Sequence, residues 1–286
     1  MLILILAFFN IIYLLKLHQP FNSYCMYKYI LCLPKFLIVI IISLCFINCK
    51  KHAIATPTNY RVFSTSFESI NDFANFYIVP QNYMNSSSHQ LSTDQVHSGQ
   101  YAHKAWIYGV NPESTLTQNN NHRAYPTIQF QKFKGGVFHT PCYISFWVWV
   151  DMKLVAHTPE NQWLSFATLT TDSTDSWSRT ILVNLDYNGY VHLMHVPLQG
   201  QKNWLYQPFT LPFPQKQWVN IKVYLDTTPG KGYAKVWQDG TLVSYANIAD
   251  GNGLLAQAHF GLYAAPSVSS GTIYNDDLEI KEVAGE

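Results

Sequence analysis

The stretch Gly232-Tyr233-Ala234-Lys235-Val236-Trp237-Gln238-Asp239-Gly240-Thr241-Leu242-Val243-Ser244-Tyr245-Ala246 has the pattern of two strands joined by a tight turn. Side chains on both sides of Asp239-Gly240 alternate in character, which is the period of a β-strand with one buried face. Asp and Gly both tolerate the positive φ that a type I′ turn requires at its central positions. The stretch therefore predicts a hairpin with strands at 232–238 and 241–246.

Similar alternating runs, bounded by Gly, Pro, Asn and Asp, recur along the chain, and helical periodicity does not persist beyond about ten residues. Asn188-Gly189 predicts a second hairpin, whereas Ser86-Ser87-Ser88 is interpreted as a loop tip. About eleven short strands with tight turns favour an all-β, antiparallel jelly-roll sandwich. The further predicted strands are Ala102–Tyr108, Thr127–Phe133, Tyr143–Met152, Trp163–Thr168, Thr180–Leu185, Tyr190–His195, Trp218–Leu225, His259–Tyr263 and Thr272–Glu282.

Composition limits the classes of partner. Charged residues make up 12% of the 286 residues and aromatic residues 15%, which favours an extended apolar core with aromatic surfaces over disorder. The net charge is +1, and Lys and Arg do not cluster beyond Lys50-Lys51, so nucleic acid is not expected as a partner. Cys142 is the only cysteine after Cys49, and we expect it to be a buried thiol.

The amino-terminal part contains a short apolar run, Phe36 to Ile47, which follows Lys35 and precedes Cys49. It is too short for the roughly 20 residues of a membrane span but suits a signal-peptide core of roughly 7–15 residues. We expect a signal peptide at 26–48, a tether at 49–61 and a domain at 62–286. Residues 1–25 are interpreted as a misassigned upstream start without structural role, since a start at Met26 places Lys28 and Lys35 before the apolar core.

The run from Lys35 to Lys51 resembles a bacterial lipoprotein signal, although Phe46 and Asn48 stand where such signals usually carry Leu and a small residue. The resemblance implies lipid attachment at Cys49, a membrane partner through that lipid, and a location at the outer membrane or cell surface. A plain cleaved signal and an uncleaved anchor are the alternatives.

The two ends of the expected domain carry matching motifs. Ser66-Phe67-Glu68 opens the domain, His97-Ser98-Gly99-Gln100-Tyr101-Ala102-His103-Lys104 follows, and Tyr274-Asn275-Asp276-Asp277-Leu278-Glu279-Ile280 closes it. These motifs resemble those of jelly-roll carbohydrate-binding modules and concanavalin A-like sandwiches, in which the first strand lies beside the last. The resemblance implies a structural calcium ion at Glu68 and Asp277, with Asp276 as a further candidate, because calcium takes hard oxygen ligands. Acids that cap strand ends in water are the alternative.

A second group of candidate residues lies at 121–130. Arg123 can hold a uronate carboxylate with two parallel hydrogen bonds, and His122 or Tyr125 can act as a base. Thr127 and Gln129 share one face of the strand, whereas His122 points away from Arg123. Several polysaccharide lyases with this sandwich use such parts, but their Tyr-x-Lys-x-Gly-x-Tyr strand is only partly matched at 259–263, which lacks the Lys. A structural loop is the alternative reading.

Two further patterns bear on function. Glycoside hydrolysis needs a pair of carboxylates, but the chain has no Glu-x-Asp-x-Glu run like that of laminarinase-type enzymes, and its mid-chain acids are scattered. Aromatic rings can stack on the apolar faces of sugars, and the candidates near loops are Trp177, Trp204 and Tyr206. Trp147 and Trp149 share one face of their strand and Phe146 the other, so one of these faces belongs to the core.

The sequence thus favours a surface lipoprotein that binds a polysaccharide without catalysis, with contacts from Arg123, Gln129, Trp177, Trp204 and Tyr206. The alternatives are a lyase that cleaves a uronic-acid polymer, with His122, Arg123 and Tyr125 as catalytic candidates, and a structural or adhesive envelope protein.

Mass analysis of the protein isolated from its native membrane tests the predicted anchor. We expect an amino terminus at Cys49 that carries lipid, because the apolar core directs export and the cysteine ends the signal. A protein with an unmodified Cys49 would reject lipid attachment.

Overall fold

The computed structural model describes residues 60–69, 86–111, 120–132, 136–158, 160–199, 203–205, 211–248 and 250–284. The predicted signal peptide, Cys49 and most of the predicted tether lie outside these residues. No helix in the described ranges is long and apolar enough to cross a membrane.

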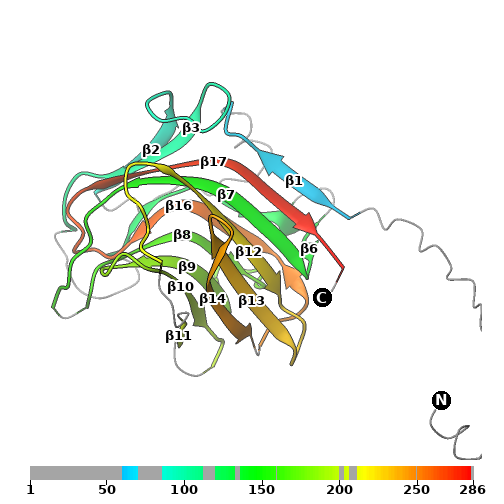
Figure 1. Cartoon of the computed structure of the whole chain (residues 1–286). Helices are drawn as coiled ribbons and strands as arrows, with labels where there is room; N and C mark the ends of the chain where they lie inside the picture. The colour runs from blue at the N-terminus through cyan, green and yellow to red at the C-terminus, as the bar shows by residue number, and fades with distance from the viewer. Residues whose placement is uncertain are drawn as a thin grey trace, which may run out of the picture. The chain divides into compact units, whose positions relative to one another are not determined.

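The larger sheet, sheet A, contains eight antiparallel strands among the described residues (Figure 1). Their order across the sheet is β14-β13-β12-β7-β17-β3-β2, and β1 also pairs with β17. The strands are β1 (Val62–Thr65), β2 (Ser87–Ser92), β3 (Ala102–Ile107), β7 (Cys142–Asp151), β12 (Trp218–Asp226), β13 (Gly232–Gln238), β14 (Thr241–Ile248) and β17 (Gly271–Glu282).

Sheet B contains seven antiparallel strands in the described part of the chain, in the order β11-β10-β9-β8-β16-β4, with β5 also paired to β16. They are β4 (His122–Ala124), β5 (Thr127–Gln129), β8 (Trp163–Thr170), β9 (Thr180–Asp186), β10 (Val191–Val196), β11 (Asn203–Leu205) and β16 (Gln257–Ala264). A short 3-10 helix, η2 (Phe130–Lys132), follows β5, and β6 (Phe138–His139) pairs with β15 (Leu254–Leu255).

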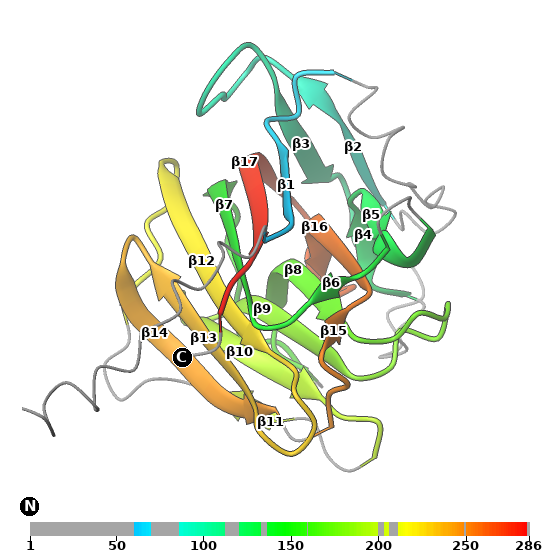
Figure 2. The ribbon, with the colours of Figure 1, turned by 90° about the vertical axis from the view of Figure 1, so that its right-hand side faces the viewer.

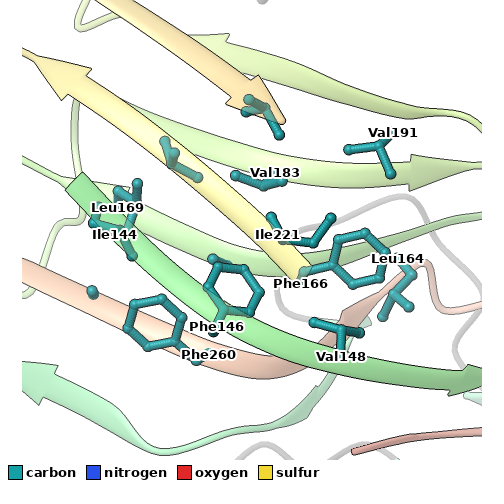
Figure 3. Close-up of a cluster of buried hydrophobic side chains, with 14 of the residues drawn as sticks. Ile144, Phe146, Val148, Leu164, Phe166, Leu169, Val183, Val191, Ile221 and Phe260 are labelled. Carbon is teal, nitrogen blue, oxygen red and sulfur yellow. The ribbon is translucent and has the colours of Figure 1, made fainter. Parts of the chain in front are cut away.

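The core lies between the two sheets, which face each other in Figures 1 and 2. From β7, the side chains of Ile144, Phe146 and Val148 point toward sheet B and are fully buried. Phe166 and Phe260 approach them from sheet B (Figure 3), and the rings of Phe146 and Phe260 meet edge to face at 5.4 Å. Because each buried large side chain contributes about 1.5–3 kcal/mol of transfer free energy, this shared layer holds the sheets together.

Most of the predicted strands are confirmed, and so is the antiparallel sandwich. Asp239 and Gly240 adopt φ values of 47° and 79°, as the predicted type I′ hairpin requires. At the second hairpin, Gly189 has a φ of 82°, and the Asp186 carboxylate accepts hydrogen bonds from the backbone N–H groups of Asn188 and Tyr190. Cys142 is buried, as expected.

Two local predictions were wrong. Ser87 and Ser88 begin β2 and pair with β3 instead of forming a loop tip. The strand predicted at 127–133 ends at Gln129, because the backbone turns into η2 at Phe130. Strand β3 begins at Ala102, as predicted, and residues 97–101 form a turn that precedes it.

Substitution of Gly240 tests the hairpin. Nothing lies within 4 Å of the position that a β-carbon would occupy, so Gly240→Ala introduces the cost of positive φ without a clash. We expect the free energy of unfolding to fall by about 1 kcal/mol in urea denaturation. Asp239→Asn is the matched control, since Asn tolerates positive φ and keeps the oxygen that accepts a hydrogen bond from Asn220. Equal stabilities of the two variants would contradict the assignment.

Candidate functional site

The outer face of sheet B, the face turned away from the core, gathers polar and aromatic side chains at the edge formed by β4, β5 and β16. Ala258, Phe260 and Ala264 of β16 belong to the core. The alternate residues Gln257, His259 and Tyr263 therefore lie on the outer face. Their register partners are Gln129, Thr127 and Arg123, respectively.

Aromatic rings surround His259. Its imidazole stacks on the Tyr125 ring at a centroid distance of 3.7 Å and an interplanar angle of 7°. Trp177 lies 5.3 Å from the imidazole, and Tyr263 meets it edge-on at 5.7 Å. Trp163 meets Tyr263 edge to face at 5.1 Å. Tyr125 and His259 are buried, whereas Trp177 and Tyr263 are half-buried, so only the latter two present ring surface to solvent.

Gly261 allows this stack to form. A β-carbon there would lie 3.0 Å from the backbone oxygen of Ala124 and 3.1 Å from the β-carbon of Tyr125, and the backbone has a φ of 134°. Glycine is the residue that tolerates both conditions, so Tyr125 can pack closely enough to lie over His259.

Arg123 lies beside Tyr263. The guanidinium carbon is 5.4 Å from the centre of the Tyr263 ring, and Nη1 donates a hydrogen bond of 3.3 Å to the backbone oxygen of Asn121. The Asn121 amide in turn donates to the Tyr263 hydroxyl at 2.8 Å. Arg123 is half-buried, so its positive charge stands next to a phenol whose oxygen is already oriented by an amide.

Burial sets the protonation states of the two stacked rings. The pKa of His259 lies well below its ordinary value, mainly through burial and also through the charge of Arg123. The imidazole is therefore neutral near pH 7. Burial raises the pKa of Tyr125, against the opposing influence of Arg123, so its phenol stays protonated.

The loop between β8 and β9 positions Trp177. The Asp172 carboxylate accepts hydrogen bonds from the backbone N–H groups of Thr174 and Ser178, and from both hydroxyls. Although burial opposes it, these hydrogen bonds lower the pKa of Asp172. Gln257 fastens the same loop through the backbone oxygens of Asp172 and Thr174, both at 2.7 Å. Trp177, with a φ of 50°, is thereby held over His259.

Gln129 belongs to this network of amides. Its Nε2 atom donates to Oε1 of Gln257 at 2.6 Å and to the Asp175 carboxylate at 3.3 Å. Its own Oε1 atom is buried and has no hydrogen-bond partner in the described structure. A buried amide oxygen without a partner is costly, and such groups are often completed by a water or a ligand.

The structure brings four of the residues singled out from the sequence to one place, namely Arg123, Tyr125, Gln129 and Trp177. His122 is in register with Ala264, whose side chain is in the core, and so faces the interior. The backbone of Trp204 lies in β11, at the far edge of sheet B, and Tyr206 lies outside the described residues.

His259 and Tyr263 were not selected from the sequence. The signals available were the alternation of Gln257, His259 and Tyr263 along one predicted strand and the partial match of 259–263 to the lyase strand. Their proximity to Arg123 depends on pairing between strands more than 130 residues apart in the chain, which the sequence pattern does not reveal.

The candidate calcium ligands join the two ends of the domain through the turn at 97–101. Asp276 accepts hydrogen bonds from the backbone N–H groups of His97 and Ser98, at 2.9 and 3.1 Å. Asp277, which has a φ of 47°, accepts from the Ser98 hydroxyl and is bonded to the His97 ring, both at 2.6 Å. Glu68 accepts from the backbone N–H groups of Gln100 and Tyr101.

The oxygens of these carboxylates are of the type that calcium takes as ligands, but they are engaged in hydrogen bonds with the turn. Within the described ranges, no three His, Cys, Asp or Glu side chains are grouped so that they could hold a metal ion. Glu68, Asp276 and Asp277 instead accept hydrogen bonds from the turn, as described above. Calcium at Glu68 and Asp277 stays a prediction.

Comparison with solved structures identifies the fold. Cellulose induced protein Cip1 superimposes with a TM-score of 0.54 at 15% identity, over 78% of this chain and all of Cip1. An endo-β-1,4-glucuronan lyase from the fungus Trichoderma reesei follows with a TM-score of 0.52 at 11% identity, over 78% of this chain and 95% of the lyase. The chain has a concanavalin A-like β-sandwich fold. Neither a scan against protein-family models nor a search of curated proteins found a match.

The pKa of Asp276 provides a test of the turn at 97–101. Burial raises this pKa to about 6, against the hydrogen bonds from Ser98 and His97. The folded protein therefore holds the proton more tightly than the unfolded chain, whose carboxyl pKa is about 4, and this group stabilises the fold as the pH falls through that window. We expect the free energy of unfolding of the wild type, relative to Asp276→Asn, to rise by on the order of 2 kcal/mol between pH 6 and about 4. A difference that is constant with pH in urea denaturation would contradict this.

Proposed function

We propose that this protein binds an acidic polysaccharide at the outer face of sheet B, and that a lipid on Cys49 holds it at the cell surface. The observation that carries the proposal is the position of Arg123, a half-exposed cation beside the half-exposed ring of Tyr263. His259 contacts both Tyr263 and the half-exposed Trp177. Aromatic rings stack on the apolar faces of pyranoses, while a guanidinium pairs with a carboxylate through two hydrogen bonds. A uronic acid presents both of these features in one sugar unit.

The surrounding residues support the same reading. Tyr125 and His259 are buried and neutral, so they hold the neighbouring rings in place. They add no charge that would repel the sugar carboxylate or compete with Arg123 for it. The amides of Gln129 and Gln257 are fully buried and hydrogen-bonded to each other, and Gln257 holds the loop that carries Trp177. The glucuronan lyase of the same fold shows that this sandwich is used for an acidic polysaccharide in another protein.

A second candidate function is cleavage of a uronic-acid polymer by β-elimination. It is favoured by the Tyr263 hydroxyl, which lies at hydrogen-bond distance from Asn121 and beside Arg123. In such a step Arg123 would stabilise the charge that builds up on the carboxylate, while a base removes the proton on the carbon next to it. The bond to the glycosidic oxygen then breaks, a carbon–carbon double bond forms, and that oxygen takes a proton.

The structure does not favour the residues that the sequence suggested as the base for this elimination. His122 faces the interior, and burial keeps the Tyr125 phenol protonated, so neither is placed to accept the proton. The half-exposed Tyr263 hydroxyl is the group beside Arg123 that can take and return it. His259 stands near the place where alginate lyases carry Lys, but it is buried and stacked on Tyr125.

Arg123→Ala tests the binding proposal. We expect its affinity for polygalacturonate or alginate to fall roughly 10- to 100-fold, because a hydrogen-bonded charge contact of about 1.5–3 kcal/mol is lost. Arg123→Lys keeps the charge but not the two-pronged geometry and should recover only part of the affinity. Affinity electrophoresis in polysaccharide-containing gels provides the measurement, and Lys153→Ala, at an exposed position after β7, is the control. Unchanged retardation of Arg123→Ala would overturn the proposal.

The wild-type protein and its variants also test the alternative that the protein is a lyase. A lyase releases unsaturated sugars that absorb in the ultraviolet, and Tyr263→Phe should then lose this release while it still binds in the gel. Absence of absorbance across a panel of acidic polysaccharides would eliminate the lyase. Absence of both binding and release would leave a structural or adhesive role.

A further inference from the structure

The outer face of sheet A carries a second concentration of aromatic rings, together with lysines. On β7, Ile144 and Phe146 point into the core, so Tyr143 and Ser145 lie on the outside. The register aligns a row of side chains across five neighbouring strands. From β14 to β17, this row consists of Tyr245, Lys235, Tyr224, Tyr143 and Lys281.

A neighbouring row strengthens the pattern. Trp237 of β13 lies beside Lys222 of β12, which is in register with Ser145. The Lys222 ammonium is 4.1 Å from the centre of the Tyr143 ring. Trp237 lies 6.2 Å from the same ring, so the two rows form one continuous surface.

The second lysine is held in the same way. The Lys235 ammonium lies 5.4 Å from the Tyr224 ring and 5.3 Å from the Tyr233 ring. Tyr233 in turn lies 6.1 Å from Tyr245, which is 47% exposed. The ammonium groups of Lys222 and Lys235, on the neighbouring strands β12 and β13, thus each lie against aromatic rings.

We propose that this surface, the Tyr–Lys platform made by Tyr143, Lys222, Tyr233, Lys235, Trp237 and Tyr245, binds an anionic polysaccharide independently of the site on sheet B. The half-exposed rings supply flat apolar contacts for pyranose faces. The ammonium groups supply charges complementary to carboxylate or sulfate groups along the chain of sugars. Strand spacing of about 4.8 Å sets the separation of neighbouring rings and cations.

The distribution of acids agrees with an anionic partner. Glu279 is in register with Ser145 and Asp226 with Tyr233, so both carboxylates belong to the margins of the platform. The interior of the two rows contains Lys222 and Lys235 without an acid between them. An anionic chain that crosses β12 and β13 would therefore meet positive charge first.

The chemistry of the platform favours a polysaccharide over a membrane surface. A surface that enters a bilayer interface presents aliphatic and aromatic side chains for burial among the acyl chains. Leu242 is the only aliphatic residue in the two rows, and the rings are mostly tyrosines with polar tips. Binding to lipid vesicles is therefore measured alongside binding to polysaccharides.

Binding measurements in the Arg123→Ala background test the platform with the sheet B site weakened. We expect residual binding to polygalacturonate, alginate or dextran sulfate, and at least a fivefold loss of that residual affinity in Lys222→Ala/Lys235→Ala. Trp237→Ala should weaken it as well, and added salt should reduce it because the contact is partly ionic. Lys153→Ala, which removes one charge elsewhere, is the control, and neutral β-glucan is the control polysaccharide.

The outcomes separate this inference from the proposed function. If Arg123→Ala abolishes all binding, the platform proposal is overturned and the sheet B site stands. If the lysine variant removes all binding and Arg123→Ala removes none, the platform stands and the sheet B proposal fails. Binding of the wild type to vesicles of anionic lipid, without binding to polysaccharide, would also overturn the platform. Circular dichroism and thermal melting verify folding, and a variant that melts earlier but binds normally would show that the lysines only stabilise the sheet.

Discussion

The packing of β7 against its two neighbours in sheet A is the constraint on which the rest of the structure depends. Ile144, Phe146 and Val148 are fully buried on one face of this strand, and β12 and β17 pair with it on either side. A shift of one residue in either pairing would turn the neighbouring strand's apolar side chains toward solvent. The same alternation decides which residues of both sheets face outward, so the two candidate binding surfaces are consequences of how the core is packed.

How much could be predicted from the sequence depended on the length of each element. The strands at 232–238 and 241–246 were predicted because alternation persists over many residues and an Asp-Gly turn separates them. The strand at 122–124 was missed because three residues are too few to show a period. Ser87 and Ser88 were assigned to a loop from their composition, yet pairing with β3 overrides the weak strand preference of serine.

The candidate site was predictable only in part, because some of its residues are close in the chain and others are not. Arg123, Tyr125 and Gln129 lie within one short segment, and the sequence showed their chemistry and which of them share a face. His259 and Tyr263 enter the site through the antiparallel pairing of β16 with β4 and β5. That pairing is a property of the whole sandwich, so side-chain chemistry alone points to half of the site and the topology supplies the other half.

The two outer faces use aromatic rings in different ways. On sheet B, Tyr125 and His259 are buried and stacked, and they form a rigid base that leaves Arg123 as the exposed charge. On sheet A, Lys222 and Lys235 lie over tyrosine rings that are themselves part of the surface. A cation held over a ring loses less side-chain freedom on binding than one on a mobile stem. Under the two proposals, sheet B would select one sugar unit with a carboxylate, whereas sheet A would hold an extended anionic chain with less selectivity.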